Sequence, residues 1–236
     1  MFFSEFGNSF HIFSLEHFIP ILIIILIIII LAIFKKNIKK IAFFIEITLI
    51  SLIVILYTFY YIWLNSHNLF DYKDDLPLEL CDIMLFLTIP LFITKNRYIF
   101  ELNYFIGIGG AIYALLTPAL YYGFPHFIYF FFFLYHFLII FAPFFMIFIY
   151  NLKVSFFSLI RSFIALNIIG FTIYIVDIVI DANYMFLREK PYGITLFSIM
   201  GDWPIYIILS EIIAIISFFI LYLPFFIYNK LKITSS

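Results

Sequence analysis

Three side chains in the sequence have the chemistry of a nucleophile and its base. Cys81 is the single cysteine and closes the motif LPLELC at 76–81. A thiolate attacks acyl carbonyls once a neighbouring base has removed the thiol proton. Successive helical residues are about 100° apart, so Glu79 and Asp82 do not both share a face with Cys81. The base must therefore come from another helix, and His126 and His136 are the candidates.

The two histidines are alternatives, because at most one of them can meet Cys81. They lie on opposite faces of one expected helix and differ in depth by about 15 Å. Depth alone favours His126, whereas helix tilt or a deep cavity would favour His136. A packing role for the cysteine, and a hydrogen-bonded core role for either histidine, are the structural alternatives.

A second group of polar residues could bind a substrate. Asp177 and Asp181 are four residues apart and share a helix face, where Arg188 or Lys190 could neutralise them. A structural ion pair that holds a long loop is an equally good interpretation. Arg188 also suits a lipid phosphate, and Asn183 is one candidate donor to an oxyanion. The candidate substrate-binding residues are His126, Glu79, Asp82, Asp177, Asn183 and Arg188.

The composition sets the class of protein that must position these residues. Of the 236 residues, 66% are hydrophobic and only 11% are charged, which is typical of a membrane protein and excludes a soluble globule. The net charge of -1 argues against a nucleic-acid partner. One cysteine excludes an internal disulfide. The chain is expected to form one domain over residues 1–236.

Seven segments are long and apolar enough to cross a membrane, which takes about 20 residues. They are expected at 17–34, 41–64, 77–94, 98–121, 126–150, 156–180 and 203–228. Seven spans place ten of the 13 Lys and Arg residues on one side, and basic residues favour the cytoplasmic side. The predicted fold is therefore all-α, a polytopic membrane protein with seven transmembrane helices, the N-terminus outside and the C-terminus inside.

Several functions of membrane proteins are excluded because the sequence lacks the residues that they require. The last span has no lysine between Trp203 and Tyr228, which excludes a retinal protein. The five histidines contain no HxxxH pair, and no GxSG motif is present, which argues against a metal hydrolase and a rhomboid-like protease. No metal and no cofactor are expected. Most ionisable residues of the spans fall in the outer half, which predicts an outward-facing polar cavity.

The motifs along the chain resemble the bacterial YwaF-like integral membrane family. They are LPLELCD at 76–82, ALLTP at 114–118, GFPHF at 123–127, FLYHF at 133–137, NYMFLREKP at 183–191 and GDWPIY at 201–206. YwaF-like proteins resemble animal hydrolases of the androgen-induced-protein type and a phospholipid acyltransferase. In those relatives a Thr or Cys nucleophile and a later His cleave or transfer fatty acyl esters.

That resemblance implies that Cys81 is the nucleophile and His136 its base. The expected activity is intramembrane acyl transfer or hydrolysis, with membrane lipids, a phospholipid or an acyl ester, as partners. The resemblance also implies a multi-pass location in a bacterial plasma membrane. The alternative is a non-enzymatic lipid-binding protein or transporter that uses the same cavity.

Overall fold

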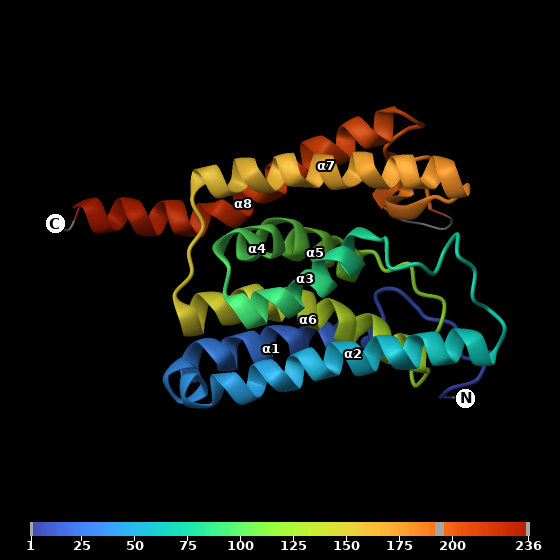
Figure 1. Ribbon diagram of the computed structural model, residues 1–236, viewed down its shortest axis with the longest axis horizontal. Helices are drawn as coiled ribbons and strands as arrows, with labels where there is room; N and C mark the ends of the chain where they lie inside the picture. Colours follow the sequence, from blue (N-terminus) through green and yellow to red (C-terminus); the bar gives the residue numbers. More distant parts are fainter. Residues whose placement is uncertain (1, 192–195, 235–236) are drawn as a thin grey trace.

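A computed structural model describes residues 2–191 and 196–234, and the described residues form helices and no named strand (Figure 1). Short 3-10 turns lie at Lys39–Ile41, Tyr184–Phe186 and Leu196–Ile199, and a π-helical turn lies at Asn103–Gly107. The α-helices are α1 Leu15–Ile38, α2 Ala42–Ser66, α3 Leu80–Thr94, α4 Arg97–Leu102, α5 Ile108–Leu116, α6 Phe127–Tyr150, α7 Phe156–Ile180 and α8 Ile205–Thr234.

Helix α6 is the centre of the molecule. It packs against α1, α2, α3, α5 and the π-helical turn, and 67% of its most apolar stretch is buried. In α7 and in α8, only 11% of the most apolar stretch is buried. These two helices pack on α4 and α5, on the side opposite α6 (Figure 1). Apolar side chains that face outward on α7 and α8 are suited to contact with lipid.

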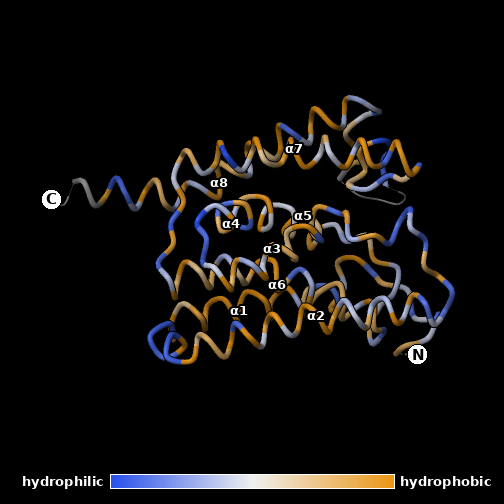
Figure 2. Tube along the Cα trace, viewed as in Figure 1, coloured by the Kyte–Doolittle hydropathy of each residue, from blue (hydrophilic) through white to orange (hydrophobic). Residues whose placement is uncertain are grey.

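Within the described residues, five continuous helical stretches are long and apolar enough to cross a membrane. They are Leu15–Ser66, Arg97–Leu116, Phe127–Tyr150, Phe156–Ile180 and Ile205–Leu231. The first of them contains both α1 and α2, which double back on each other at the Lys-rich turn (Figure 1). The apolar helix α3 is shorter, at 15 residues. Figure 2 shows the hydrophilic residues gathered at helix ends and connections, with the α1–α2 turn strongly hydrophilic.

The helix bounds differ from the expected spans where capping groups and prolines intervene. The third span was expected from residue 77, but α3 begins at Leu80 because Glu79 caps its N-terminus. The fourth was expected to reach residue 121, but α5 ends at Leu116. Thr117 precedes Pro118, and the residue before a proline is disfavoured in the α conformation. The sixth expected span, 156–180, coincides with α7.

The π-helical turn joins α4 to α5 and brings the backbone close to its neighbours. A Cβ added at Gly107 would lie 3.1 Å from Ile139 Cγ2 on α6, which is tight contact. Asn103, fully buried in the same turn, donates to the Ile99 carbonyl and accepts a hydrogen bond of 3.2 Å from Thr88 Oγ1 on α3. The turn therefore packs closely against α3 and α6 where it joins α4 to α5.

Candidate functional site

Cys81 lies in the first turn of α3 and faces α5. A Cβ added at Gly110 would lie 3.8 Å from the Cys81 sulfur, so the glycine leaves room for the thiol. The side chain is half-buried, and the thiol makes no hydrogen bond with any residue in the described part of the chain. Helix α3 begins here because Glu79 and Asp82 form a capping box, each side chain accepting a hydrogen bond from the other's backbone N–H.

Asp82, the residue after Cys81, is the centre of a hydrogen-bond cluster between three helices. Its Oδ1 accepts hydrogen bonds from the hydroxyl of Tyr57 on α2 and, at 2.7 Å, from that of Tyr135 on α6. Its Oδ2 accepts from the Glu79 backbone N–H at 3.1 Å. A carboxylate at membrane depth needs such donors, and three of them here satisfy both of its oxygens.

His136, the residue after Tyr135, is buried on α6 with only 4% of its surface exposed. Its Nδ1 lies 2.7 Å from the Phe132 carbonyl oxygen. Because a carbonyl oxygen only accepts, Nδ1 carries the hydrogen, and Nε2 of the neutral ring keeps its lone pair. In the described part of the chain, Asp177 Oδ2 is the only fully enclosed side-chain oxygen or nitrogen without a hydrogen bond. Nε2 of His136 has no hydrogen-bond partner among the described residues either.

The Tyr135–Asp82 hydrogen bond joins α3 and α6 at the residues next to the two catalytic candidates. Cys81 directly precedes Asp82 in α3, and His136 directly follows Tyr135 in α6. No hydrogen bond joins the Cys81 sulfur to the His136 ring among the described residues. The Cys81 sulfur lies beside Gly110 of α5, whereas the His136 ring bonds to the Phe132 carbonyl of its own helix.

His126 has a structural place at the start of α6. Its Nδ1 accepts a hydrogen bond from the Ile128 backbone N–H, which caps the helix, and its Nε2 lies 2.9 Å from the Ser4 carbonyl oxygen. The ring stacks on Tyr122 at a centroid distance of 4.0 Å. Both nitrogens of His126 are therefore engaged, and the ring is buried.

Glu79 and Asp177 hold the segment that follows α7 against the start of α3. Glu79 Oε2 accepts a hydrogen bond of 3.0 Å from the Met185 N–H, and Asp177 Oδ1 accepts one of 2.9 Å from the Tyr184 N–H. The Tyr184 hydroxyl in turn accepts from the Leu76 N–H and donates to the Tyr72 carbonyl. Both carboxylates thus bond to partners within the protein.

Asn183 and Arg188 are engaged in the same segment. Asn183 Oδ1 accepts from the backbone N–H groups of Arg188 and Glu189, and the Arg188 guanidinium donates to the Asp177 and Ala182 carbonyls. Asp181 forms ion pairs with Lys73 at 2.9 Å and with Arg188 at 3.2 Å. The hydrogen bond from Lys73, and then that from Arg188, lower the pKa of the Asp181 carboxyl. These contacts are those of the structural ion pair considered above.

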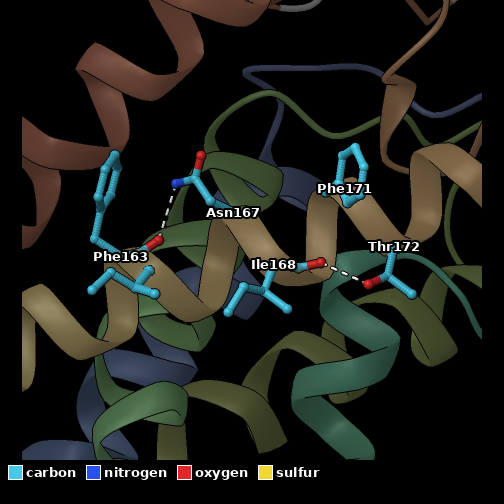
Figure 3. A pocket seen from close by; sticks show the side chains of 6 residues that line it. Phe163, Asn167, Ile168, Phe171 and Thr172 are labelled. Carbon is cyan, nitrogen blue, oxygen red and sulfur yellow. Dashed lines mark hydrogen bonds between the residues drawn. The ribbon is translucent and has the colours of Figure 1, made fainter.

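Two open apolar grooves lie away from Cys81 and His136. One, with a volume of 390 Å³, follows the outer surface of α7 at Phe163, Asn167 and Phe171 (Figure 3). The other, of 430 Å³, lies between the start of α7 and the second half of α8. No group of three or more metal-ligating side chains gathers in the described residues.

The sequence interpretation missed the two tyrosines that bind Asp82. Tyr57 and Tyr135 lie within long apolar segments in a chain with 18 tyrosines, so composition did not distinguish them. Their signal was depth: a tyrosine hydroxyl far from the membrane surface needs a polar partner, and Asp82 is the acidic group in reach.

Comparison with known proteins identifies one matching family. No curated protein and no solved structure matches the chain. A model of the TMEM164 family, a family of membrane proteins, matches residues 12–222. That match covers α1 to α7 and the larger part of α8, including both Cys81 and His136. The chain belongs to the TMEM164 family.

Proposed function

We propose that the protein transfers or hydrolyses a lipid acyl ester within the membrane, with Cys81 as nucleophile and His136 as base. The observation that carries the proposal is the 2.7 Å hydrogen bond between Tyr135 and Asp82. It supports the pairing because Cys81 directly precedes Asp82 in α3 and His136 directly follows Tyr135 in α6. The His136 tautomer, with an unprotonated Nε2, is the form that a general base requires.

The reaction needs one proton to move twice. His136 Nε2 takes the thiol proton, and the Cys81 thiolate attacks the acyl carbonyl carbon. The ester C–O bond breaks, the acyl group stays on sulfur as a thioester, and the leaving alcohol takes the proton from Nε2. A second alcohol or water then resolves the thioester by the reverse proton transfers. Because the two side chains do not bond in the free protein, they must turn toward each other when lipid binds.

We also propose seven membrane crossings with the N-terminus outside. The α1–α2 hairpin divides the stretch Leu15–Ser66 into two crossings, and α3 supplies a short one. The four lysines at the α1–α2 turn would then lie in the cytoplasm, as basic residues prefer. The bacterial plasma membrane, and the YwaF-like relationship, are parts of the same proposal.

Non-covalent binding or transport of lipid is the alternative. It is favoured by the Cys81 sulfur, which packs against Gly110 without a hydrogen bond in the described part of the chain. A thiol in that position would fill space and would tolerate replacement by alanine.

Lipid turnover by purified variants in phospholipid vesicles separates the two functions. Cys81→Ala should abolish acyl release, and His136→Ala should slow it by about 10²- to 10⁴-fold, the usual contribution of a general base. His11→Ala, a change at an exposed histidine, serves as the matched control and should keep the wild-type rate. Wild-type turnover by Cys81→Ala would contradict the enzymatic proposal and favour the binding protein.

A further inference from the structure

The N-terminal segment, residues 2–14, lies at the end of the molecule where α2 ends and α6 begins (Figure 1). The Phe127 backbone N–H, in the first turn of α6, donates to the Phe2 carbonyl at 2.7 Å. Phe3 packs on the buried apolar cluster that Phe127 forms with Trp63 of α2. The segment therefore covers part of this cluster and is bonded to the helix that forms the centre of the molecule.

Two histidines fasten the two ends of this segment, and each has only 1% of its surface exposed. At the start of the segment, His126 Nε2 bonds to the Ser4 carbonyl oxygen at 2.9 Å. At its end, the Phe13 N–H donates to His17 Nδ1 at 3.1 Å. The same ring bonds through Nε2 to the Leu115 carbonyl oxygen of α5 at 2.7 Å. Each ring thus links the segment to the helix bundle.

Both rings are bonded in a way that only the neutral imidazole permits. In each, Nδ1 accepts a hydrogen bond from a backbone N–H, so Nε2 carries the hydrogen that the carbonyl oxygen accepts. A second proton would occupy Nδ1 and break its hydrogen bond to the N–H. At His126 the added charge would also lie at the N-terminus of α6, where the helix dipole disfavours a cation.

His67, at the end of α2, shows the contrasting arrangement. Its Nδ1 bonds to the Trp63 carbonyl oxygen at 2.8 Å, so Nδ1 carries the hydrogen. The second proton would enter at Nε2, which forms no hydrogen bond with any other described residue. Protonation of His67 therefore breaks no bond in that part of the chain, whereas protonation of His17 or His126 breaks one each.

No carboxylate bonds to either ring to offset the cost of the added charge. The other titratable side chains on residues 2–17, 63–67 and 113–130 are Glu5, His11, Glu16, His67, Tyr113, Tyr121, Tyr122 and Tyr129. Among the described residues, none of them hydrogen-bonds to His17 or His126. The Glu16 carboxylate accepts instead from the backbone N–H groups of His11 and Phe124. Because a ring released into water can take up a proton, the bound segment holds fewer protons than the released one, and acid favours release.

We propose that His17 and His126 form a proton-sensitive latch, which holds residues 2–14 on the bundle at neutral pH and releases them in acid. Release would uncover the apolar cluster of Trp63 and Phe127 on which Phe3 packs. The latch involves neither of the residues assigned to the acyl chemistry, so its test is independent of the proposed reaction.

The distance between two spin labels tests the latch in the full chain in phospholipid nanodiscs. Cys81→Ser removes the native thiol. Phe6→Cys and Tyr121→Cys, at side chains that are 79% and 78% exposed, carry labels attached at neutral pH. We expect one short distance at pH 8. At pH 5 a longer and broader population should be at least about fivefold larger, since each proton taken up on release shifts the equilibrium by up to about tenfold per pH unit. Equal distance distributions at the two pH values would overturn the proposal.

Replacing the two histidines identifies the groups that respond to acid. In the double variant His17→Gln/His126→Asn, asparagine is a preferred N-cap and glutamine can donate to the Leu115 carbonyl, but neither side chain takes up a proton. Its distance distribution should be the same at pH 5 and pH 8. His11→Ala, at an exposed histidine of the same segment, should keep the wild-type response. A double variant that still responds to acid would contradict the latch. If it does not fold, each single variant should respond less than the wild type, and an unchanged response in both would contradict the latch equally.

Discussion

The Tyr135 hydroxyl is buried and donates to Asp82, so its removal should be measurable. Tyr135→Phe should lower the free energy of unfolding by about 1–3 kcal/mol, the usual cost of a lost hydrogen bond to a charged group. Thermal unfolding in detergent would measure the change. Tyr121→Phe, at a 78% exposed tyrosine, is the control. Equal effects of the two substitutions would show that Asp82 does not depend on Tyr135.

The ion pairs of Asp181 should stabilise the protein at neutral pH but not in strong acid. Its lowered pKa means that its ion pairs stabilise the fold above the ordinary value of 3.8. That contribution is lost as the pH falls through the lowered value. Asp181→Asn should therefore reduce the Tm slightly at pH 7 and have no effect in strong acid. The effect is small because 73% of the Asp181 side chain is exposed. An equal change in Tm at both pH values would contradict this.

Individual residues were predictable where their chemistry is rare and unpredictable where their partners are remote. Cys81 could be singled out because it is the only cysteine, and His136 only through a family resemblance. That Asp82 binds Tyr57 and Tyr135 depends on three helices meeting, which no local spacing encodes. The capping role of His126 was missed because histidine is not among the preferred N-cap residues.

At the scale of elements, Glu101 ties α4 to α7. Only 1% of the residue is exposed, and its carboxylate accepts from Arg161 at 2.8 and 2.9 Å, from Ser158 at 2.7 Å and from Arg97 at 3.0 Å. Arg161→Ala should lower the free energy of unfolding by about 1–3 kcal/mol, because a buried charge loses its two-pronged donor.

Arg97→Ala is the matched control for that prediction. Arg97 lies four residues before Glu101 on the same helix, and 58% of its side chain is exposed. Its loss should cost only about 0.3–0.5 kcal/mol, because the Arg97 guanidinium is largely in solvent and Arg161 and Ser158 still bond to the Glu101 carboxylate. Chemical denaturation of the two variants would measure both values. A larger effect from Arg97→Ala would mean that the α4–α7 contact does not rest on Arg161.

A helix could be predicted from the sequence where a long apolar segment alone determines its bounds. The span 156–180 coincides with α7 because Ser155 caps its start and polar residues follow its end. The π-helical turn at Asn103–Gly107 could not be predicted, because it depends on Asn103 meeting Thr88 of α3. Packing of the segment after α7 on the start of α3 depends likewise on Glu79 and Asp177, from two separate helices.

For the whole molecule, the membrane topology is the first quantity to measure. Seven crossings predict that a reporter fused after Lys232 is cytoplasmic, because ten of the 13 basic residues then share the inner face. A tag placed before Phe2 should be accessible from outside. Protease protection or reporter activity in intact cells would measure each end. Both termini on one side of the membrane would rule out the seven-crossing arrangement.

The central proposal, an acyl group carried by Cys81, is tested most directly by the mass of the intact protein after incubation with a diacyl phospholipid. The wild-type chain should gain one acyl group that neutral hydroxylamine removes, as expected of a thioester. Cys81→Ser should change the lability of the adduct, and Cys81→Ala should carry none. A wild-type chain that gains no acyl group while it still releases fatty acid, or an adduct that persists in Cys81→Ala, would contradict the assignment of Cys81 as nucleophile.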